Sequence, residues 1–305
     1  MRPTAGAIRG AMRRAAMRCA SSSALERMRS PQELRVGTLN LRSLNADVKD
    51  VATAIIQHGG PLDVLAVQEV DTRWNDRLDR LADLLRMRVA VVAEADPFVA
   101  LSNALLVTEA TEATAHEPCT LDCYDPESRV AVALTLGPRM PHVVCTHLDH
   151  RAESVRLAQL EQLRVHAEAL GSRSSLKSLP MLLLGDLNAL RRADYSDAQW
   201  AALVSKRAEH GIKSATELTD TLERRADQGG WGWSDCRDVA LCNGRTVTGD
   251  LATSVYGARV DYIWASPAML RDWDVCEVSH VDVAQMHAPD AFTDHALVTC
   301  TLSRR

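Results

Sequence analysis

Several apolar segments of this sequence begin or end with residues whose side chains bind cations or transfer protons. The residue types are Asn, Asp, Glu and His almost exclusively. They stand at Asn40, Gln68–Glu69, His147–Asp149–His150, Asp186–Asn188, Asp261 and Asp294–His295. One such terminus is an ordinary turn, because Asp and Asn side chains bond their own backbone. Six such termini in one sequence are hard to explain as turns alone. Loops on a rigid scaffold are where sites form, so we expect the termini to meet in one acidic, oxygen-rich cleft.

Oxygen ligands of this kind favour a hard divalent cation. Mg²⁺ prefers one or two carboxylates with a carboxamide and waters, and it leaves its remaining positions to substrate phosphate. A Zn²⁺ site would more often cluster His and Cys at short spacing, as in an HExxH motif, which the sequence lacks. The predicted chemistry is therefore metal-assisted attack on a phosphate ester, with Mg²⁺ as the cofactor and Mn²⁺ as the alternative.

Strands dominate the elements that must position these residues. Apolar or alternating patterns predict strands at 34–41, 62–71, 103–108, 128–136, 141–148, 181–187, 259–265 and 295–302. Helical periodicity predicts helices at 47–60, 72–87 and 152–170. No Gly-rich phosphate loop follows the first strand. A two-sheet sandwich flanked by helices therefore fits better than a doubly wound parallel sheet.

Six motifs in order carry a family resemblance. They are "TLNLRS", "VQEVD", "THLDH", "GDLNA", "RVDYIWAS" and "TDHALV". Together they resemble the endonuclease/exonuclease/phosphatase family over residues 34–303. The resemblance implies a four-layered α/β sandwich, in which two packed, mostly antiparallel β-sheets are flanked by helices. It also implies a metal-dependent phosphoric ester hydrolase.

The resemblance implies roles for the acidic and amide residues. Glu69 resembles the main Mg²⁺ ligand, with Asn40 beside it, and Asp294 resembles a second acidic group near the metal. Asp186 resembles the carboxylate that orients or deprotonates the attacking water. Asn188 resembles the carboxamide that holds the phosphate or the water.

Two histidines complete the implied catalytic set. His295 resembles the histidine that contacts the scissile phosphate, and Asp261 resembles its partner. A carboxylate inside the apolar run "RVDYIW" would be costly to bury alone, so a histidine partner also explains Asp261 physically. His147 resembles a donor to the phosphate or to the leaving oxygen. Asn103 resembles a position that faces substrate phosphate.

Some assignments stay open at the level of sequence. Arg156 and Gln159 share a helix face that either points at the cleft and binds substrate or is solvated. Asp149 either supports His147 or belongs to a turn. The tryptophans of "QGGWGWSD" either pack under neighbouring helices or stack on a substrate base.

The first thirty residues differ from the rest. Residues 1–30 hold seven Arg and one Glu among many Ala and Ser, which is typical of an organellar transit peptide. We expect a mitochondrial protein, with the cytoplasm as the alternative. The domain follows at 31–305, with a helical insertion at about 191–232. The whole chain carries a net charge of −5 and the leader +6, so the remainder carries −11.

These properties limit the function classes. The acidic body does not suit non-specific duplex binding, which relies on Lys and Arg. No apolar run is long enough to span a membrane. The eight cysteines include no CxxC pair, which favours reduced thiols. We expect a monomer.

Three functions remain. The first is a phosphodiesterase acting on nucleic acid like a nuclease. The second is a hydrolase of a small-molecule or lipid phosphate ester. The third is an inactive binding scaffold, which would normally have lost a metal ligand or the base.

Overall fold

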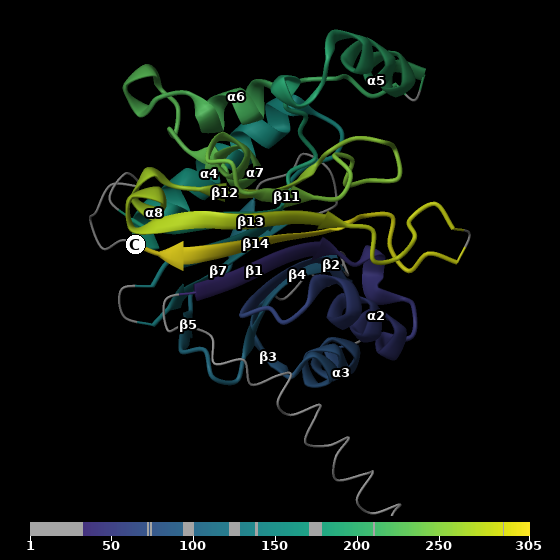
Figure 1. The fold of residues 1–305 in the computed structure, drawn as a ribbon, viewed down its shortest axis with the longest axis vertical. Coiled ribbons are helices and arrows are strands. Elements are labelled where there is room, and N and C mark those ends of the chain that lie inside the picture. The colour runs from purple at the N-terminus through teal and green to yellow at the C-terminus, as the bar shows by residue number, and fades with distance from the viewer. Residues whose placement is uncertain are drawn as a thin grey trace, which may run out of the picture. The chain divides into compact units, whose positions relative to one another are not determined.

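Two β-sheets packed face to face form the centre of the protein (Figure 1). The computed structural model describes residues 33–71, 73, 75–93, 101–121, 129–137, 140–170, 179–209, 211–288 and 290–305. The predicted leader at 1–30 lies outside the described residues. The segment Leu34–Arg305 forms one unit, which contains both sheets.

Among the described residues each sheet contains seven strands. The first has the order β11-β13-β14-β1-β2-β4-β3, and the second has the order β10-β12-β9-β8-β7-β5, with β6 also paired to β7. The first sheet comprises β1 (Glu33–Asn40), β2 (Val64–Asp71), β3 (Met87–Val92), β4 (Leu101–Thr108), β11 (Thr246–Thr248), β13 (Trp273–Val281) and β14 (Leu297–Arg304). The second comprises β5 (Ala113–Ala115), β6 (Cys119–Leu121), β7 (Arg129–Leu136), β8 (His142–His147), β9 (Met181–Asp186), β10 (Ser234–Asp235) and β12 (Asp261–Ala265).

Helices lie between the strands in sequence. They are α2 (Val48–Ala54) with its continuation η2 (Ile55–Gly59), α3 (Asn75–Leu85), α4 (Glu153–Leu170), α5 (Asp197–Glu209), α6 (Glu217–Glu223), α7 (Cys236–Cys242) and α8 (Pro267–Asp272). Short helical turns are η1 (Arg42–Leu44), η4 (Arg192–Asp194) and η5 (Ala226–Gln228). None of the described helices combines the length and apolarity that crossing a membrane requires.

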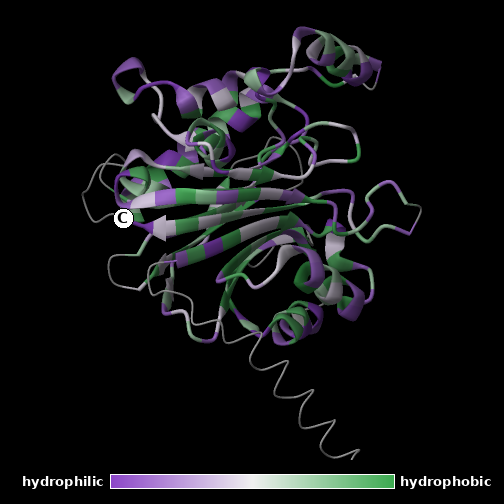
Figure 2. Cartoon of the chain, viewed as in Figure 1, coloured by the Kyte–Doolittle hydropathy of each residue, from purple (hydrophilic) through white to green (hydrophobic). Residues whose placement is uncertain are grey.

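Successive residues of a strand point to opposite faces, so a strand buried on both faces is apolar throughout. In β2, Val64 and Ala66 pack into the core between the sheets, whereas Leu65 and Val67 pack against α2 and α3. The second sheet repeats this arrangement, because its outer face packs against α4 and α6. Figure 2 shows the hydrophobic residues along the strands and the hydrophilic ones along the outer helices.

The order of layers is therefore helices, sheet, sheet and helices, which confirms the predicted four-layered α/β sandwich. Both sheets are mixed. The pairs β1–β2, β8–β9 and β11–β13 are parallel. Antiparallel pairs are β2–β4, β3–β4, β13–β14, β5–β7, β6–β7, β7–β8, β9–β12 and β10–β12. The parallel pairs matter for the site, because they carry the ends of consecutive strands to the same edge.

One long strand was not among the sequence predictions. β13 alternates apolar Trp273, Val275 and Val278 with polar residues and pairs along β14. A register shift between Val275 and Glu277 interrupts its alternation, so its period of two is broken in the middle. That irregularity explains why the pattern is weak in sequence.

The structure gives the state of the described cysteines and the positions of Trp231 and Trp233. The described cysteines are free thiols, at Cys119, Cys145, Cys236, Cys242, Cys276 and Cys300. Trp231 and Trp233 are buried and contact each other, with ring centroids 5.1 Å apart. They are core residues, as the packing alternative proposed.

Candidate active site

Strand register sets three site residues in a row across the second sheet. In the parallel pair β8–β9, His147 lies opposite Asp186. In the antiparallel pair β9–β12, Asp186 lies opposite Asp261. All three side chains are buried, with Asp261 at 0% and Asp186 at 2% exposure. Three ionisable groups therefore occupy neighbouring positions at one edge of the sheet.

A glycine permits this close pairing. Gly185 precedes Asp186 and has a φ of 143°, a value that side-chain-bearing residues rarely adopt. A Cβ atom placed on Gly185 would lie 1.9 Å from the Thr146 carbonyl oxygen. The glycine of "GDLNAL" is thus a requirement of the close approach of β8 and β9.

The first sheet contributes Asn40 and Glu69. Asn40 is the last residue of β1 and lies opposite Gln68 of β2. Glu69 follows at an irregularity between Val67 and Val70, and its φ is 54°. Such bulges re-aim a side chain, and a positive φ in a non-glycine residue stores strain that is typical of functional sites. The Glu69 side chain keeps 24% exposure, so it is buried less than its partners.

Asn40 joins the two sheets at this edge. Its Nδ2 donates to Glu69 Oε1 at 3.1 Å and to Asp186 Oδ2 at 3.2 Å. Its Oδ1 accepts from the Arg42 backbone N–H at 3.0 Å. The carboxylates of Glu69 and Asp186 are therefore close enough to share one amide nitrogen.

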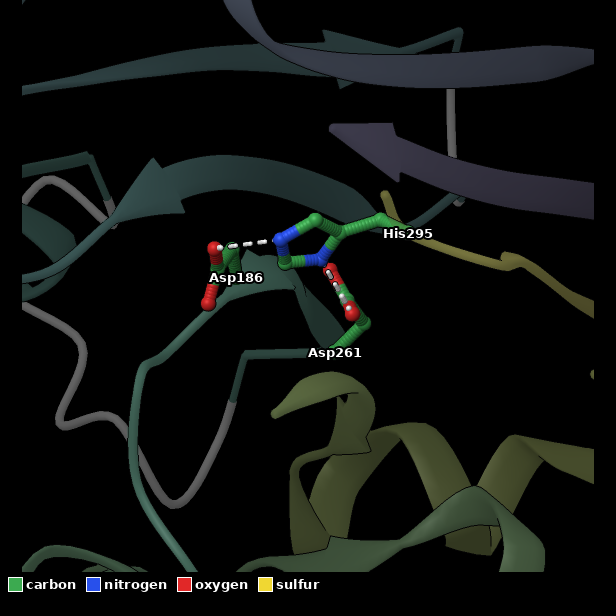
Figure 3. Close-up of side chains that lie close together, drawn as sticks. All are labelled: Asp186, Asp261 and His295. Carbon is green, nitrogen blue, oxygen red and sulfur yellow. Dashed lines mark hydrogen bonds and ion pairs between the residues drawn. The ribbon is translucent and has the colours of Figure 1, made fainter. Parts of the chain in front are cut away.

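His295 lies between the two aspartates, as Figure 3 shows. Its Nδ1 lies 2.8 Å from Asp261 Oδ2, and its Nε2 lies 3.7 Å from Asp186 Oδ2. The segment before β14 is held in place by Thr293, whose hydroxyl donates to the Asn40 carbonyl at 2.6 Å and accepts from the His295 N–H at 3.1 Å. The Asp261 N–H donates to Thr253 Oγ1 at 3.0 Å.

The charges at this position follow from burial and pairing. Burial raises the pKa of Asp186 to about 7, although the nearby His295 imidazolium pulls it down. For His295, burial lowers the pKa, but the carboxylates of Asp261 and Asp186 outweigh it and raise the pKa to about 10. A protonated imidazole thus lies beside a carboxyl that titrates near neutral pH.

His147 and Asn188 border the other side of Asp186. His147 Nε2 lies 3.4 Å from Asp186 Oδ2 and 3.0 Å from Asn188 Nδ2. Asn188 has a φ of 50°, and its N–H donates to Asp186 Oδ1 at 2.9 Å. Burial, reinforced by the charge of Arg129, lowers the pKa of His147 well below its usual value.

The donor set fits a hard divalent cation. Asp186, Asp261 and His295 place ligand atoms within 4.8 Å of one another, but the raised pKa of His295 disfavours the neutral ring that a metal ligand requires. Asp261 Oδ1 is buried without a hydrogen-bond partner among the described residues. Buried carboxylates with one compensating imidazolium leave a negative excess that a cation would balance. The more exposed Glu69 carboxylate beside Asn40 is the better cation position.

A second acidic group is not a metal site. Asp194, Asp235 and Asp238 also converge. Arg259 Nη1 lies 3.0 Å from Asp194 Oδ2 and 2.6 Å from Asp235 Oδ2, and Arg191 contacts both Asp194 and Asp238. Each guanidinium contacts two of the three carboxylates, so the group is interpreted as a structural ion-pair network.

Two further predicted residues lie beside the site. Asp294 is half-buried, its carbonyl accepts from the Val255 N–H at 2.8 Å, and its charge helps to raise the pKa of His295. Asn103 lines a small hollow with Glu69 and His147, and its Nδ2 donates to the Val130 carbonyl at 2.7 Å. Their roles toward metal and substrate stay predictions.

Arg156 occupies a structural position. It is 2% exposed, its Nε donates to Glu153, and its Nη1 donates to the Asp149 carbonyl at 2.8 Å. Gln159 Oε1 accepts from the Asp149 N–H at 2.8 Å. Both side chains hold the β8–α4 loop and are neither solvated nor open to substrate, so the position of Arg156 does not support substrate binding. The Asp149 carboxylate accepts from the Arg151 and Ala152 N–H groups, as a turn residue does.

Sequence reasoning missed Arg129. Its Nη1 lies 2.9 Å from His147 Nδ1, and it lines the same hollow as Glu69. Arg129 is the first residue of β7, which runs antiparallel to β8. The start of one strand therefore meets the end of the other. A search of strand ends alone passes over such a residue.

The fold and this site define a phosphoester hydrolase of the layered α/β type. The family model described as "Endonuclease/Exonuclease/phosphatase family" matches residues 37–295, and the chain belongs to this family. Family membership and the acidic cluster also support a divalent metal. No sequence among the curated proteins matches the chain.

Solved structures share the fold. The human Nocturnin catalytic domain is 16% identical, with a TM-score of 0.59, covering 90% of this chain and 95% of that one. A mannosyl-6-phosphatase from Bacteroides thetaiotaomicron is 14% identical, with a TM-score of 0.59 and coverage of 88% and 99%. Truncated TDP2 from Caenorhabditis elegans is 17% identical, with a TM-score of 0.55 and coverage of 89% and 98%. At these identities the likeness concerns the fold alone.

Proposed function

We propose that this protein is a Mg²⁺-dependent phosphodiesterase that hydrolyses its ester by in-line attack of water. One observation carries the proposal: Glu69 of β2, Asp186 of β9 and His295 before β14 lie together. Asn40 Nδ2 bridges the carboxylates of Glu69 and Asp186, and His295 Nε2 lies 3.7 Å from Asp186 Oδ2. Glu69, Asp186 and His295 supply a carboxylate for a cation, a buried carboxyl and an imidazolium. These are the parts that phosphoryl transfer to water needs.

Asp186 is the proposed base. Its pKa of about 7 lets it accept a proton from the attacking water near neutral pH. The Asn188 N–H bond to Asp186 Oδ1 fixes the carboxyl and leaves Oδ2 facing the site. Mg²⁺, when held by Glu69, whose carboxylate Asn40 orients through Nδ2, would polarise the phosphate and balance its charge.

His295 is the proposed donor to a non-bridging oxygen. Asp261 accepts from Nδ1, so Nε2 carries the donated proton toward the site. Asn188 and His147 stand on the opposite side of Asp186 and complete the contacts to the phosphate. The charge developing on the phosphate oxygens is thus met by groups already in place.

The test is a substrate panel with Mg²⁺ and with EDTA. It comprises single-stranded DNA, RNA, a tyrosyl-DNA conjugate, sphingomyelin, an inositol phosphate and bis(p-nitrophenyl) phosphate. We expect Mg²⁺-dependent hydrolysis by the wild type and losses on the order of 1000-fold in Glu69→Gln and Asp186→Asn. Full activity of both variants would refute the proposed roles. Inactivity of the wild type on every ester would favour the binding-scaffold alternative.

For the substrate, a nucleic acid strand is the first candidate, supported by the family description, which names endonucleases and exonucleases. A small-molecule or lipid ester is the second, favoured by the net charge of −11 beyond residue 30. A pocket of about 380 Å³ also adjoins His295 through the Ser254–His295 bridge, and the described residues that line it include no Lys or Arg. Such a pocket suits an uncharged group better than a second phosphate.

We also propose import into mitochondria through residues 1–30, with the cytoplasm as the alternative. The support is the Arg-rich, acid-poor composition of that segment. A fluorescent fusion of the full chain should enter mitochondria, and one lacking residues 1–30 should not. Identical distributions of the two would refute import.

A further inference from the structure

One buried threonine connects the main chain on either side of the Asp261–His295 pair. Thr253 is 0% exposed, and its Oγ1 accepts from the Val260 and Asp261 N–H groups, each at 3.0 Å. Its carbonyl accepts from the Ala296 N–H at 2.8 Å. Asp261 belongs to the second sheet, and His295 precedes β14 of the first. Thr253 therefore links the two sheets beside the pair that Figure 3 shows.

The segment that begins at Thr253 runs alongside the segment that contains His295. Ser254 lies opposite His295 in an antiparallel bridge. The Val255 N–H donates to the Asp294 carbonyl at 2.8 Å. Together with the bond that the Thr253 carbonyl accepts, this places one main-chain hydrogen bond on each side of His295. These two bonds fix the position of the His295 backbone.

The Asp261 carboxylate depends on its own main chain for its position. Its Oδ2 lies 2.8 Å from His295 Nδ1, whereas its Oδ1 has no hydrogen-bond partner among the described residues. A carboxylate with a single hydrogen bond moves with the backbone that carries it. The bond from the Asp261 N–H to Thr253 Oγ1 therefore helps to set the distance between Asp261 and His295.

The turn after Thr253 has a fixed shape. The Thr253 and Ser254 N–H groups both donate to the Ala258 carbonyl at 3.0 Å, and the Gly257 N–H donates to the Ser254 carbonyl at 2.9 Å. Ala258 and Val260 also belong to a hydrophobic cluster with Leu190, Tyr195 and Leu203, the last of which lies on α5. The turn is therefore held both from the site and from α5, so Thr253 has a defined position.

We propose that Thr253 is a positioning residue, which holds Asp261 and His295 at the distance that their hydrogen bond requires. The inference rests on the proposed function. Thr253 acts through main-chain contacts and does not meet the substrate, because its side chain is buried. A β-branched side chain suits this role, since its χ1 angle is restricted. Valine would keep the shape but could not accept the two N–H groups, whereas serine would keep the acceptor.

Steady-state kinetics with bis(p-nitrophenyl) phosphate and Mg²⁺ test the inference. Thr253→Val should lower kcat on the order of 100-fold, because a displacement of about 1 Å at a reacting group has an effect of that size. The KM should change little, because His295 is proposed to meet charge that develops in the transition state. Thr253→Ser should keep most of the wild-type kcat.

Ser266→Ala is the matched control. Ser266 is also fully buried, and its Oγ also accepts from two main-chain N–H groups, those of Met181 at 3.0 Å and Met269 at 3.1 Å. It follows the end of β12 that is remote from Asp261. Its loss should therefore lower stability and leave kcat unchanged, as a merely structural hydroxyl would.

Proton NMR gives a measurement that needs no turnover. The His295 Nδ1–H proton is hydrogen-bonded to Asp261, and it should give a slowly exchanging signal in the wild type near neutral pH. Thr253→Val should lose this signal. Thr253→Ser and Ser266→Ala should retain it.

Wild-type kcat in a Thr253→Val variant that is folded by circular dichroism would overturn the inference. So would an equal loss of kcat in Thr253→Ser, which keeps the hydroxyl, or in Ser266→Ala. If Thr253→Val does not fold, Thr253→Ala takes its place, and a kcat equal to that of Thr253→Ser would overturn the inference. If the wild type hydrolyses no ester but only Thr253→Val loses the His295 signal, the proposed function fails and this inference stands.

Discussion

Replacing Asp261 with asparagine should change the protonation state of His295. Asp261 is fully buried and lies 2.8 Å from His295 Nδ1, and it is the largest favourable influence on the imidazolium. The Asp261→Asn variant keeps the shape and removes the charge. The pKa of His295 should then fall from about 10 toward its ordinary value near 6.5. The carboxylates of Asp186 and Asp294 still favour the charged form in this variant, but burial, the largest influence, opposes them, so we expect a pKa near the ordinary value.

The magnitude follows from the titration. At pH 8 nearly all wild-type His295 is protonated, whereas a histidine with a pKa of about 6.5 is only about 3% protonated. If the imidazolium is the active form, Asp261→Asn should lose about 30-fold in activity relative to the wild type at pH 8, and almost nothing at pH 6, from protonation of His295 alone. Loss of orientation should lower the whole profile by a further factor on the order of 10 to 100.

The assay is kcat/KM for bis(p-nitrophenyl) phosphate from pH 5.5 to 9.5, with nitrogen NMR of His295 over the same range. Asp274→Asn is the matched control, since Asp274 pairs with Arg305 at the surface. Its profile should follow that of the wild type. A profile for Asp261→Asn parallel to that of the wild type, with an unchanged His295 titration, would refute the role of Asp261.

Three further predictions concern stability. The pKa of Asp186 is about 7 in the folded state, above its unfolded value of 3.8. The stability that this carboxyl contributes to the fold is therefore present at low pH and is lost as pH rises through 7. Asp186→Asn should stabilise the protein at pH 8 in EDTA by up to about 4 kcal/mol, measured as a higher Tm. Gly185→Ala should lower the free energy of unfolding by about 3 kcal/mol or more, because the added Cβ would overlap Thr146. Gly211→Ala is the control: its Cβ meets no neighbour within 4 Å among the described residues, so it should cost less in the same denaturation assay. His280 is buried, and burial lowers its pKa to about 4. Between pH 7 and pH 5 the unfolded state therefore binds a proton that the folded state does not, and the free energy of unfolding should fall by about 2 kcal/mol. In urea denaturation His280→Gln should show a smaller fall, and an equal fall would exclude this histidine as the cause.

Much of the site follows from the polar residues at strand ends. Asn40, Asp186 and His295 could be found in sequence because each interrupts an apolar segment, and buried strands tolerate such groups only where they serve the site. Their chemistry, hard oxygen donors with histidine, follows from residue type alone. The two-sheet architecture follows because strands with two apolar faces must be covered on both sides.

Other features depend on pairing between distant segments. Arg129 joins the site because β7 runs antiparallel to β8, and no local pattern at residue 129 announces that direction. The sequence leaves Arg156 open as a substrate-binding residue, but the fold turns it under the β8–α4 loop. β13 escaped notice because a register shift breaks its alternation.

By itself, the sequence determined which polar residues stand at buried strands and what chemistry their side chains could supply, because residue type and periodicity are local properties. Only the tertiary structure decided which of them touch. The pKa values of Asp186 and His295 depend on burial and on charges contributed by distant strands, and such interactions exist only once the two sheets have packed together.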